Sequence, residues 1–132
     1  YLLSALGGAV ASFFFSDITT VSVGASGAIF GLMGALVVAG RRLRYDVTQV
    51  LVLLGINVVI GFLAPGIDWR AHLGGLVTGA LVAAILVHAP RKSRTFIQVA
   101  GLGGVLLILV AVAMLRTSQI QELLAPLGVI TT

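Results

Sequence analysis

Five long runs of apolar residues alternate with short polar segments along this chain. A helix that crosses the hydrocarbon of a bilayer needs about 20 residues at a rise of about 1.5 Å each. The third, fourth and fifth runs approach that length, and we expect the first to be cut short by the start of the chain. The pattern predicts an all-α fold, a polytopic transmembrane bundle of about five helices. The expected helices cover approximately residues 1–15, 25–40, 47–64, 71–89 and 96–115.

The second run is too short to span a membrane, and the segment before it is unusual. Residues 16–24, Ser-Asp-Ile-Thr-Thr-Val-Ser-Val-Gly, are polar and β-branched and therefore favour a helix poorly. This segment must lie near membrane depth if the next helix is to span. Irregular backbone persists at that depth only where protein buries it or water lines it. We therefore expect the helix that carries Ser26 to begin inside the bilayer, at the floor of a water-filled cavity.

The composition is that of a membrane protein, with 59% hydrophobic residues and only 9% charged residues. Six of the eight Lys and Arg residues lie in two clusters, residues 41–44 and 91–94, each between apolar runs. Such clusters mark cytoplasmic loops by the positive-inside rule. They do not form the basic stripe beside aromatic residues that would indicate a nucleic-acid partner. We expect loops 41–46 and 90–95 to be cytoplasmic, and residues 16–24 and 65–70 to face outside.

Both ends of the chain carry a prediction. The chain begins at Tyr1, within an apolar run and without an initiator Met, so we expect a fragment whose N-terminal part is missing. Residues 116–132 are polar at first and then apolar, with Pro126 and Gly128 as helix breakers. The predicted division is a membrane core over residues 1–115 and a loosely ordered outer-side tail over 116–132.

A serine and a histidine on different predicted helices come to similar depths. Ser26 lies about 22 Å above the cytoplasmic arginines at helical rise, and His72 about 28 Å above them. A helix tilt of about 20° partly absorbs the difference of about 6 Å. The spacing therefore permits a contact between Ser26 and His72 just below the outer surface.

Small residues favour close approach of these two helices. On the helix with His72, three of them share the face of the histidine: Gly75, Gly79 and Ala83. The helix with Ser26 carries its own small residues: Gly27, Gly31 and Gly34. Close packing would bring the hydroxyl and the imidazole within about 3 Å. Phe30, one turn below Ser26, is placed to lie against the imidazole ring.

This arrangement favours nucleophilic catalysis. A serine hydroxyl becomes a good nucleophile when a neutral histidine takes its proton. The free N–H groups at a helix start supply donors for an oxyanion, and Gly24 and Gly27 would let the backbone bend there. The chain has no cysteine, which excludes a thiolate nucleophile and a cysteine-based metal site. Nothing in the sequence indicates a metal or another cofactor.

A triad would need a carboxylate beside His72, and candidates are few. The four carboxylates are Asp17, Asp46, Asp68 and Glu122. Asp46 belongs to a cytoplasmic loop and Glu122 to the tail. Asp68 is four residues before His72 and can reach it, but we favour a solvated or helix-capping role for Asp68. The sequence therefore favours a Ser–His dyad.

Two stretches carry a family resemblance: GASGAIFGLMGAL, which contains Ser26, and AHLGGLVTG, which contains His72. Together they resemble the paired signature of the rhomboid intramembrane serine proteases, Gly-x-Ser-Gly on one core helix and Ala-His-x-x-Gly-x-x-x-Gly on another. The resemblance implies that Ser26 is the nucleophile and His72 the general base. It also implies an active-site turn at Gly24, Ala25 and Gly27, Phe30 in place of an aromatic that stacks on the histidine, and close-packing glycines at Gly31, Gly75 and Gly79.

The resemblance extends over most of the chain and implies more than the dyad. The five runs would be the third to sixth core helices and an appended seventh, within a protein of six plus one helices. The family's second core helix, which carries a His and an Asn of the oxyanion hole, is not in this chain. Expected partners are the lipid bilayer and transmembrane protein substrates, cleaved at a site that opens to the outer side of a bacterial plasma membrane.

Two other classes of function remain as alternatives. A transporter-type bundle would be expected to show inverted repeats or an intramembrane charge, and neither is evident. A non-catalytic rhomboid-like protein that binds transmembrane clients would be expected to lose Ser26 or His72. The other polar residues have structural interpretations, an interhelical hydrogen bond for Asn57 and an interfacial position for His88. Trp69 either anchors at the outer interface or gates the site. The sequence carries no signal for an oligomeric state.

Overall fold

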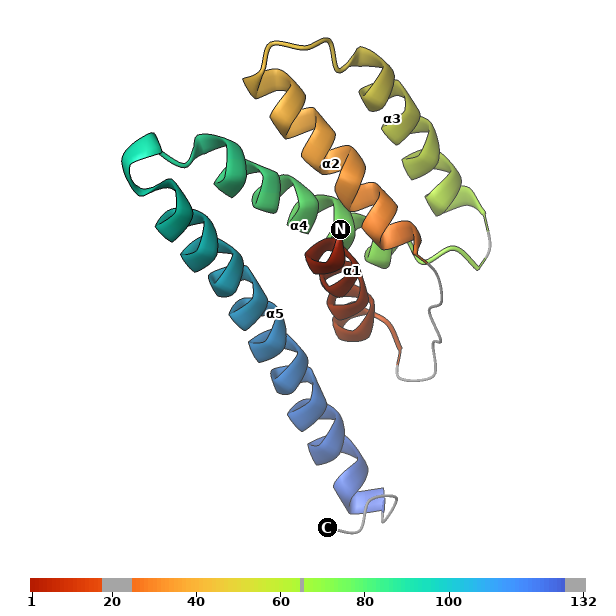
Figure 1. Cartoon of the computed structure of the whole chain (residues 1–132). Helices are drawn as coiled ribbons and strands as arrows, with labels where there is room; N and C mark the ends of the chain where they lie inside the picture. Colours follow the sequence, from red (N-terminus) through yellow and green to blue (C-terminus); the bar gives the residue numbers. More distant parts are fainter. Residues whose placement is uncertain (18–24, 65, 128–132) are drawn as a thin grey trace.

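The structure, a computed structural model, describes residues 1–17, 25–64 and 66–127 (Figure 1). Within these ranges the chain is helical and contains no strand, so the predicted all-α fold is confirmed. The first four helices begin and end within two residues of their predicted limits. Short 3-10 turns cover Arg91–Ser93 and Ala125–Leu127. The α-helices are α1 (Leu2–Phe15), α2 (Ser26–Arg42), α3 (Thr48–Leu63), α4 (Trp69–His88) and α5 (Arg94–Leu124).

The last helix is longer than predicted, because α5 continues past residue 115 to Leu124. The expectation of a loosely ordered tail is therefore wrong for residues 116–124, whereas residues 128–132 lie outside the described ranges. The hydroxyls of Thr117 and Ser118 each donate a 2.9 Å hydrogen bond to a carbonyl of the preceding turn, which accommodates these polar residues within the helix. The first residue that interrupts the helix is Pro126. The change from apolar to polar residues marks the end of the apolar surface and not the end of the helix.

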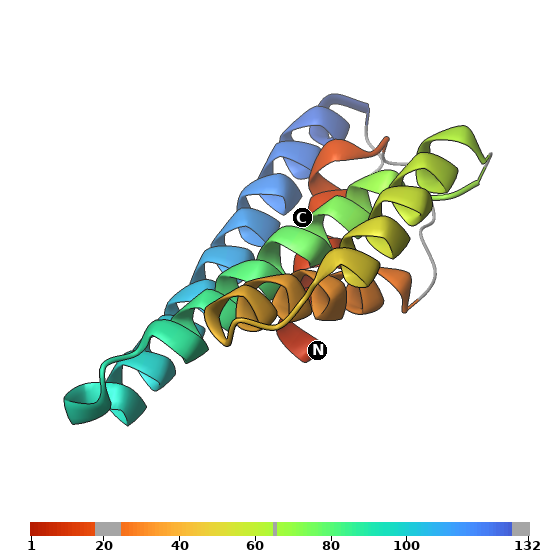
Figure 2. The same cartoon turned by 90° about the horizontal axis from the view of Figure 1, so that it is seen from above.

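Helix α4 lies at the centre of the bundle. It packs most extensively on α2 and next on α1, and it lies between α5 and the pair formed by α2 and α3 (Figure 2). Helix α3 runs beside α2 but touches the rest of the bundle sparsely, and Gly61 is its one buried residue. The serine and the histidine therefore belong to the two helices that pack most closely together.

The interior and the surface are composed as expected for a bundle in lipid. Large apolar side chains cover the outside, while much of the buried set is small or polar. Because lipid is as apolar as leucine, helices in a membrane gain more from close backbone packing than from burying large side chains. Helix α4 and the segment Arg91–Leu124 are each long and apolar enough to cross a membrane. The buried polar residues are Ser4, Ser12, Ser16 and Thr78.

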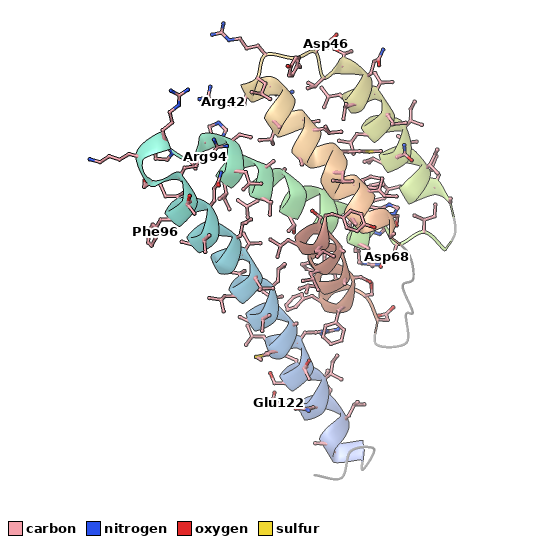
Figure 3. All side chains as sticks on the ribbon, viewed as in Figure 1. Arg42, Asp46, Asp68, Arg94, Phe96 and Glu122 are labelled. Atoms are coloured by element: carbon pink, nitrogen blue, oxygen red, sulfur yellow. The ribbon has the colours of Figure 1, made fainter. Side chains whose placement is uncertain are left out.

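The charged residues mark the two ends of the bundle. Figure 3 shows Arg42 and Arg94 at one end and Asp68 at the other end of α4. We call the end formed by residues 41–46 and 90–95 the basic end. The opposite end, where α2 and α4 begin, is called the site end. Both predicted basic loops thus lie toward the same end of the bundle, away from Ser26 and His72.

Candidate active site

Ser26 is the first residue of α2, and Ala25 is its N-cap. Alanine has no side-chain acceptor, and among the described residues no side chain caps this helix start. The first four N–H groups of an α-helix have no partner within the helix and form the positive end of its dipole. The Ser26 hydroxyl therefore lies at a helix start whose first N–H groups have no side-chain cap within the described part of the chain.

His72 lies in the first turn of α4, and this helix start is capped. Asp68 is the N-cap, and its carboxylate accepts hydrogen bonds from the backbone N–H groups of Arg70 at 3.0 Å and Ala71 at 3.2 Å. An acidic N-cap fixes the first turn and favours the helix dipole. These bonds give Asp68 the capping role that the sequence favoured, and they hold the turn from which the imidazole projects.

The two helix starts bring the serine and the histidine together. The Ser26 Oγ atom lies 2.8 Å from the His72 Nε2 atom, within hydrogen-bond distance, although the two residues are 46 positions apart. For the hydroxyl to donate to Nε2, the neutral imidazole must carry its proton on Nδ1. This is the geometry that a histidine needs to take a proton from a serine.

Phe30 and Gly61 enclose the imidazole. The Phe30 ring stacks on the His72 ring, with centroids 4.2 Å apart and planes 6° from parallel. On the α3 side, a Cβ atom at Gly61 would lie 3.3 Å from His72 Nδ1, so glycine leaves the ring its space. A small pocket of about 40 Å³ adjoins it, lined by residues of α2, α3 and α4 that include Trp69 and Leu73. The sequence pointed to Phe30 but not to Gly61, since one glycine in an apolar run carries no signal by itself.

Four predicted glycines form the contact between α2 and α4. A Cβ atom built on Gly75 would overlap the carbonyl of Gly27, and one on Gly79 would overlap the carbonyl of Gly31. The two glycines of each helix are four residues apart and therefore lie on one face. The backbones of α2 and α4 touch directly along this face, on the two helices that carry Ser26 and His72.

Helix α1 contributes a third face of small residues that our sequence interpretation missed. Gly8 packs against the carbonyl of Ala71, next to His72, where an added Cβ atom would lie 2.7 Å from the oxygen. Ser4 packs against Gly31 of α2. Ser4, Gly8 and Ser12 are all buried, and their spacing of four residues in the sequence is the signal that could have revealed this face.

Two further predictions concern the surroundings of the dyad. Gly24, predicted to shape the active-site turn, lies outside the described residues. Within the described ranges, no group of three His, Cys, Asp or Glu residues is placed to hold a metal ion. The described site is thus a serine, a histidine, a stacked aromatic ring and closely packed glycines.

These features define a class of protein: a helical membrane bundle with a serine–histidine contact at the start of two glycine-packed helices. Comparison with protein families agrees, because the Rhomboid domain matches residues 1–89. The chain belongs to the rhomboid family, whose members are integral membrane proteins. No solved structure matches the chain at a significant level.

Curated relatives include proteases and proteins named only as rhomboid-like. Rhomboid protease GluP of Bacillus subtilis (strain 168) is 43% identical over 91 residues, which cover 65% of this chain and 18% of GluP. RHOMBOID-like protein 4 of Arabidopsis thaliana is 38% identical over 98 residues, or 68% of this chain and 24% of that protein. Rhomboid protease AarA of Providencia stuartii is 32% identical over 90 residues, which cover 57% of this chain and 32% of AarA. The chain spans less than a third of the length of each of these relatives.

Proposed function

We propose that this chain forms the catalytic part of an intramembrane serine endopeptidase, with Ser26 as nucleophile and His72 as general base. The observation that carries the proposal is the 2.8 Å distance between Ser26 Oγ and His72 Nε2. Membership of a family that includes serine proteases supports the same function. The proposed substrates are transmembrane segments of other proteins, because the dyad lies on apolar helices of a membrane bundle.

The first step is attack of Ser26 on the scissile carbonyl. His72 Nε2 takes the hydroxyl proton while Oγ bonds to the carbonyl carbon, which gives a tetrahedral oxyanion and an imidazolium. Stacking against Phe30 holds the imidazole plane while its charge changes. The uncapped N–H groups at the start of α2 are available donors for the oxyanion.

The later steps return the enzyme to its starting state. The imidazolium gives its proton to the leaving amine as the peptide bond breaks, which leaves an acyl group on Ser26. Water then attacks the acyl carbon while His72 Nε2 takes its proton, and the imidazolium returns that proton to Ser26 Oγ as the acyl–oxygen bond breaks, which releases a free carboxylic acid. His72 Nε2 takes or gives a proton in every step, so its position beside Ser26 matters throughout the cycle.

The proposed orientation places the basic end in the cytoplasm and the site end outside, in a bacterial plasma membrane. The positive-inside rule supports it, because loops 41–46 and 90–95 both carry basic residues and lie toward the same end of the bundle. In a cysteine-free background, Asp17→Cys should react with an impermeant maleimide added outside intact cells. Lys92→Cys should react only after the cells are opened. The reverse pattern would invert the proposed topology.

The function is tested by labelling the full-length protein with a serine-directed fluorophosphonate and by cleavage of a transmembrane reporter. We expect Ser26→Ala to abolish labelling and cleavage. We expect His72→Ala to lower both by several orders of magnitude, because an unassisted serine is a poor nucleophile. Ser93→Ala and His88→Ala are matched controls at the basic end and should retain full activity.

Two outcomes would separate the proposal from its rivals. Absence of labelling at Ser26 in a folded preparation that still binds transmembrane clients would identify a non-catalytic rhomboid-like protein. Full cleavage by His72→Ala would mean that another group serves as the base. In either case the Ser–His contact would be structural.

A further inference from the structure

A second and much larger cavity lies on the face of α4 opposite His72. It is a groove of about 900 Å³, open on one side and bounded by α1, α4 and α5. Its walls are apolar, with Val77 on α4 and Leu109, Val112 and Leu115 on α5. The volume lies within the range of about 300–1,000 Å³ typical of ligand pockets.

The groove is held open by contacts at both ends of α5. At the basic end, Gln98 Nε2 donates a 2.9 Å hydrogen bond to the carbonyl of Leu86, which joins α5 to α4. At the site end, Arg116 donates to the carbonyls of Phe13 at 3.3 Å and Ser16 at 3.4 Å, which joins α5 to α1 instead. Because α5 is tied to different helices at its two ends, it diverges from α4 between them (Figure 1).

The length of the groove fits one leaflet of a bilayer. Along α4 it extends from Trp69 to Thr78, which is about 14 Å at helical rise. The hydrocarbon of a bilayer is about 30 Å thick, so one leaflet supplies about half of that. A transmembrane helix would need a groove of twice this length. The dimension therefore favours an acyl chain of a single leaflet.

Among the described residues that line the groove, one carries a charge, and it is a cation. Arg70 lines the groove at the site end, and its guanidinium carbon lies 5.1 Å from the centroid of the Trp69 ring. Tryptophan favours the interface between membrane and water, so we expect the guanidinium stacked on Trp69 to lie at the level of the lipid phosphates. A guanidinium binds phosphate by paired hydrogen bonds. The chemistry of the groove thus changes from apolar to cationic over the length of one phospholipid.

We propose that this groove binds one anionic phospholipid, with an acyl chain between α1, α4 and α5 and the phosphate on Arg70. The inference rests on the membrane position of the bundle and is independent of proteolysis. Trp69 and Leu73 line both the groove and the small pocket beside His72. The bound lipid therefore packs against the first turn of α4, which carries the imidazole, and steadies its position.

Trp69 reports directly on the occupant, since it is the single tryptophan of these 132 residues and lines the groove. The full-length protein is reconstituted in phosphatidylcholine vesicles with increasing fractions of phosphatidylglycerol that carries brominated acyl chains. Bromine quenches tryptophan on contact, and subtraction of the Trp69→Phe signal isolates Trp69. We expect half-maximal quenching at a lower fraction of brominated phosphatidylglycerol than of brominated phosphatidylcholine.

Two pairs of variants test the head and the tail of the site. Arg70→Gln should weaken the preference for phosphatidylglycerol about fivefold, the effect of one cation near an anionic lipid surface. Arg94→Gln at the basic end should leave it unchanged. Val112→Phe fills the groove and should reduce quenching, whereas Val110→Phe, on the same helix but outside the lining, should not. Unchanged curves for both Arg70→Gln and Val112→Phe would overturn the proposal, as would relief of quenching by an added transmembrane peptide.

Discussion

Gly75→Ala is the substitution that most directly tests whether glycine packing sets the dyad distance. The added Cβ atom would lie 2.5 Å from the carbonyl carbon of Gly27 and 2.9 Å from its Cα atom, whereas ordinary contacts are 3.4–4 Å. The obstructing atoms are backbone and cannot rotate away. Helix α4 must therefore move away from α2 at this level.

The size of that movement determines how much catalytic rate and stability the substitution should cost. Restoring ordinary contact needs a shift of at least about 1 Å, because the carbonyl oxygen of Gly27 would lie closer still, and a misplacement of about 1 Å costs about 100-fold in rate. His72 lies one turn from Gly75, so its 2.8 Å contact with Ser26 would lengthen beyond hydrogen-bond distance. Forcing extra volume into a packed contact also costs about 1–3 kcal/mol of stability. We expect kcat/KM to fall about 100-fold and the melting temperature to fall with it.

The assay compares fluorophosphonate labelling rates, reporter cleavage and thermal unfolding in the same detergent. Gly104→Ala on α5 is the matched control, because nothing lies within 4 Å of its added Cβ atom. Replacing a helical glycine by alanine in open space should stabilise by about 0.5–1 kcal/mol and leave activity intact. A Gly75→Ala protein with normal labelling rate and normal melting temperature would refute the view that backbone contact sets the dyad distance.

Three other substitutions have defined outcomes. Phe30→Leu removes the ring stacked on His72. The free energy of unfolding should fall by about 0.5–1.5 kcal/mol in addition to the loss from the smaller buried apolar area, and Ser26 should be labelled more slowly. Gly61→Ala places a methyl group against His72 Nδ1 and should slow the labelling of Ser26. Gly55→Ala, on the same helix but with nothing within 4 Å of its added Cβ atom, should not slow it, and equal labelling rates for the two variants would contradict the close fit at Gly61. Hydrogen bonds from the side chain and backbone of Thr48 lower the pKa of Asp46 below its ordinary value of 3.8. The ionised Asp46 carboxylate therefore stabilises the folded protein above pH 3.8, and this stabilisation is lost as the pH falls through the lower pKa of the folded state. The melting temperatures of the protein and of Asp46→Asn should therefore converge in acid.

The helices could be predicted from the sequence because their limits coincide with changes in hydropathy. Polar or basic residues follow α1, α2 and α4, and each helix ends within three residues of the change. Helix α5 is the exception, since its apolar surface ends near residue 115 while its backbone continues to Leu124. Hydropathy reports which surface meets lipid, and only breakers such as Pro126 report where a helix must stop.

The contact between Ser26 and His72 could be predicted because two separate sequence patterns both indicated that the two residues lie close together. Spacing placed the two residues at similar depth, and glycines four residues apart marked the faces that carry them. The role of α1 was missed because its small face, with Ser4 and Gly8, has no chemical group that draws attention. The groove beside α5 could not be predicted, because it depends on Arg116 reaching carbonyls about one hundred residues earlier in the chain.

The two helix starts at the site differ in a way that suits their chemistry. Asp68 satisfies amides at the start of α4, so that turn is rigid and its positive end is occupied by a carboxylate. Ala25 provides no such acceptor at the start of α2, and no other described side chain caps the amides beside Ser26. A base must be held in place, whereas a nucleophile must sit beside donors that are free for the oxyanion. An acidic cap before the histidine and an alanine before the serine suit these opposite needs of the dyad that we propose.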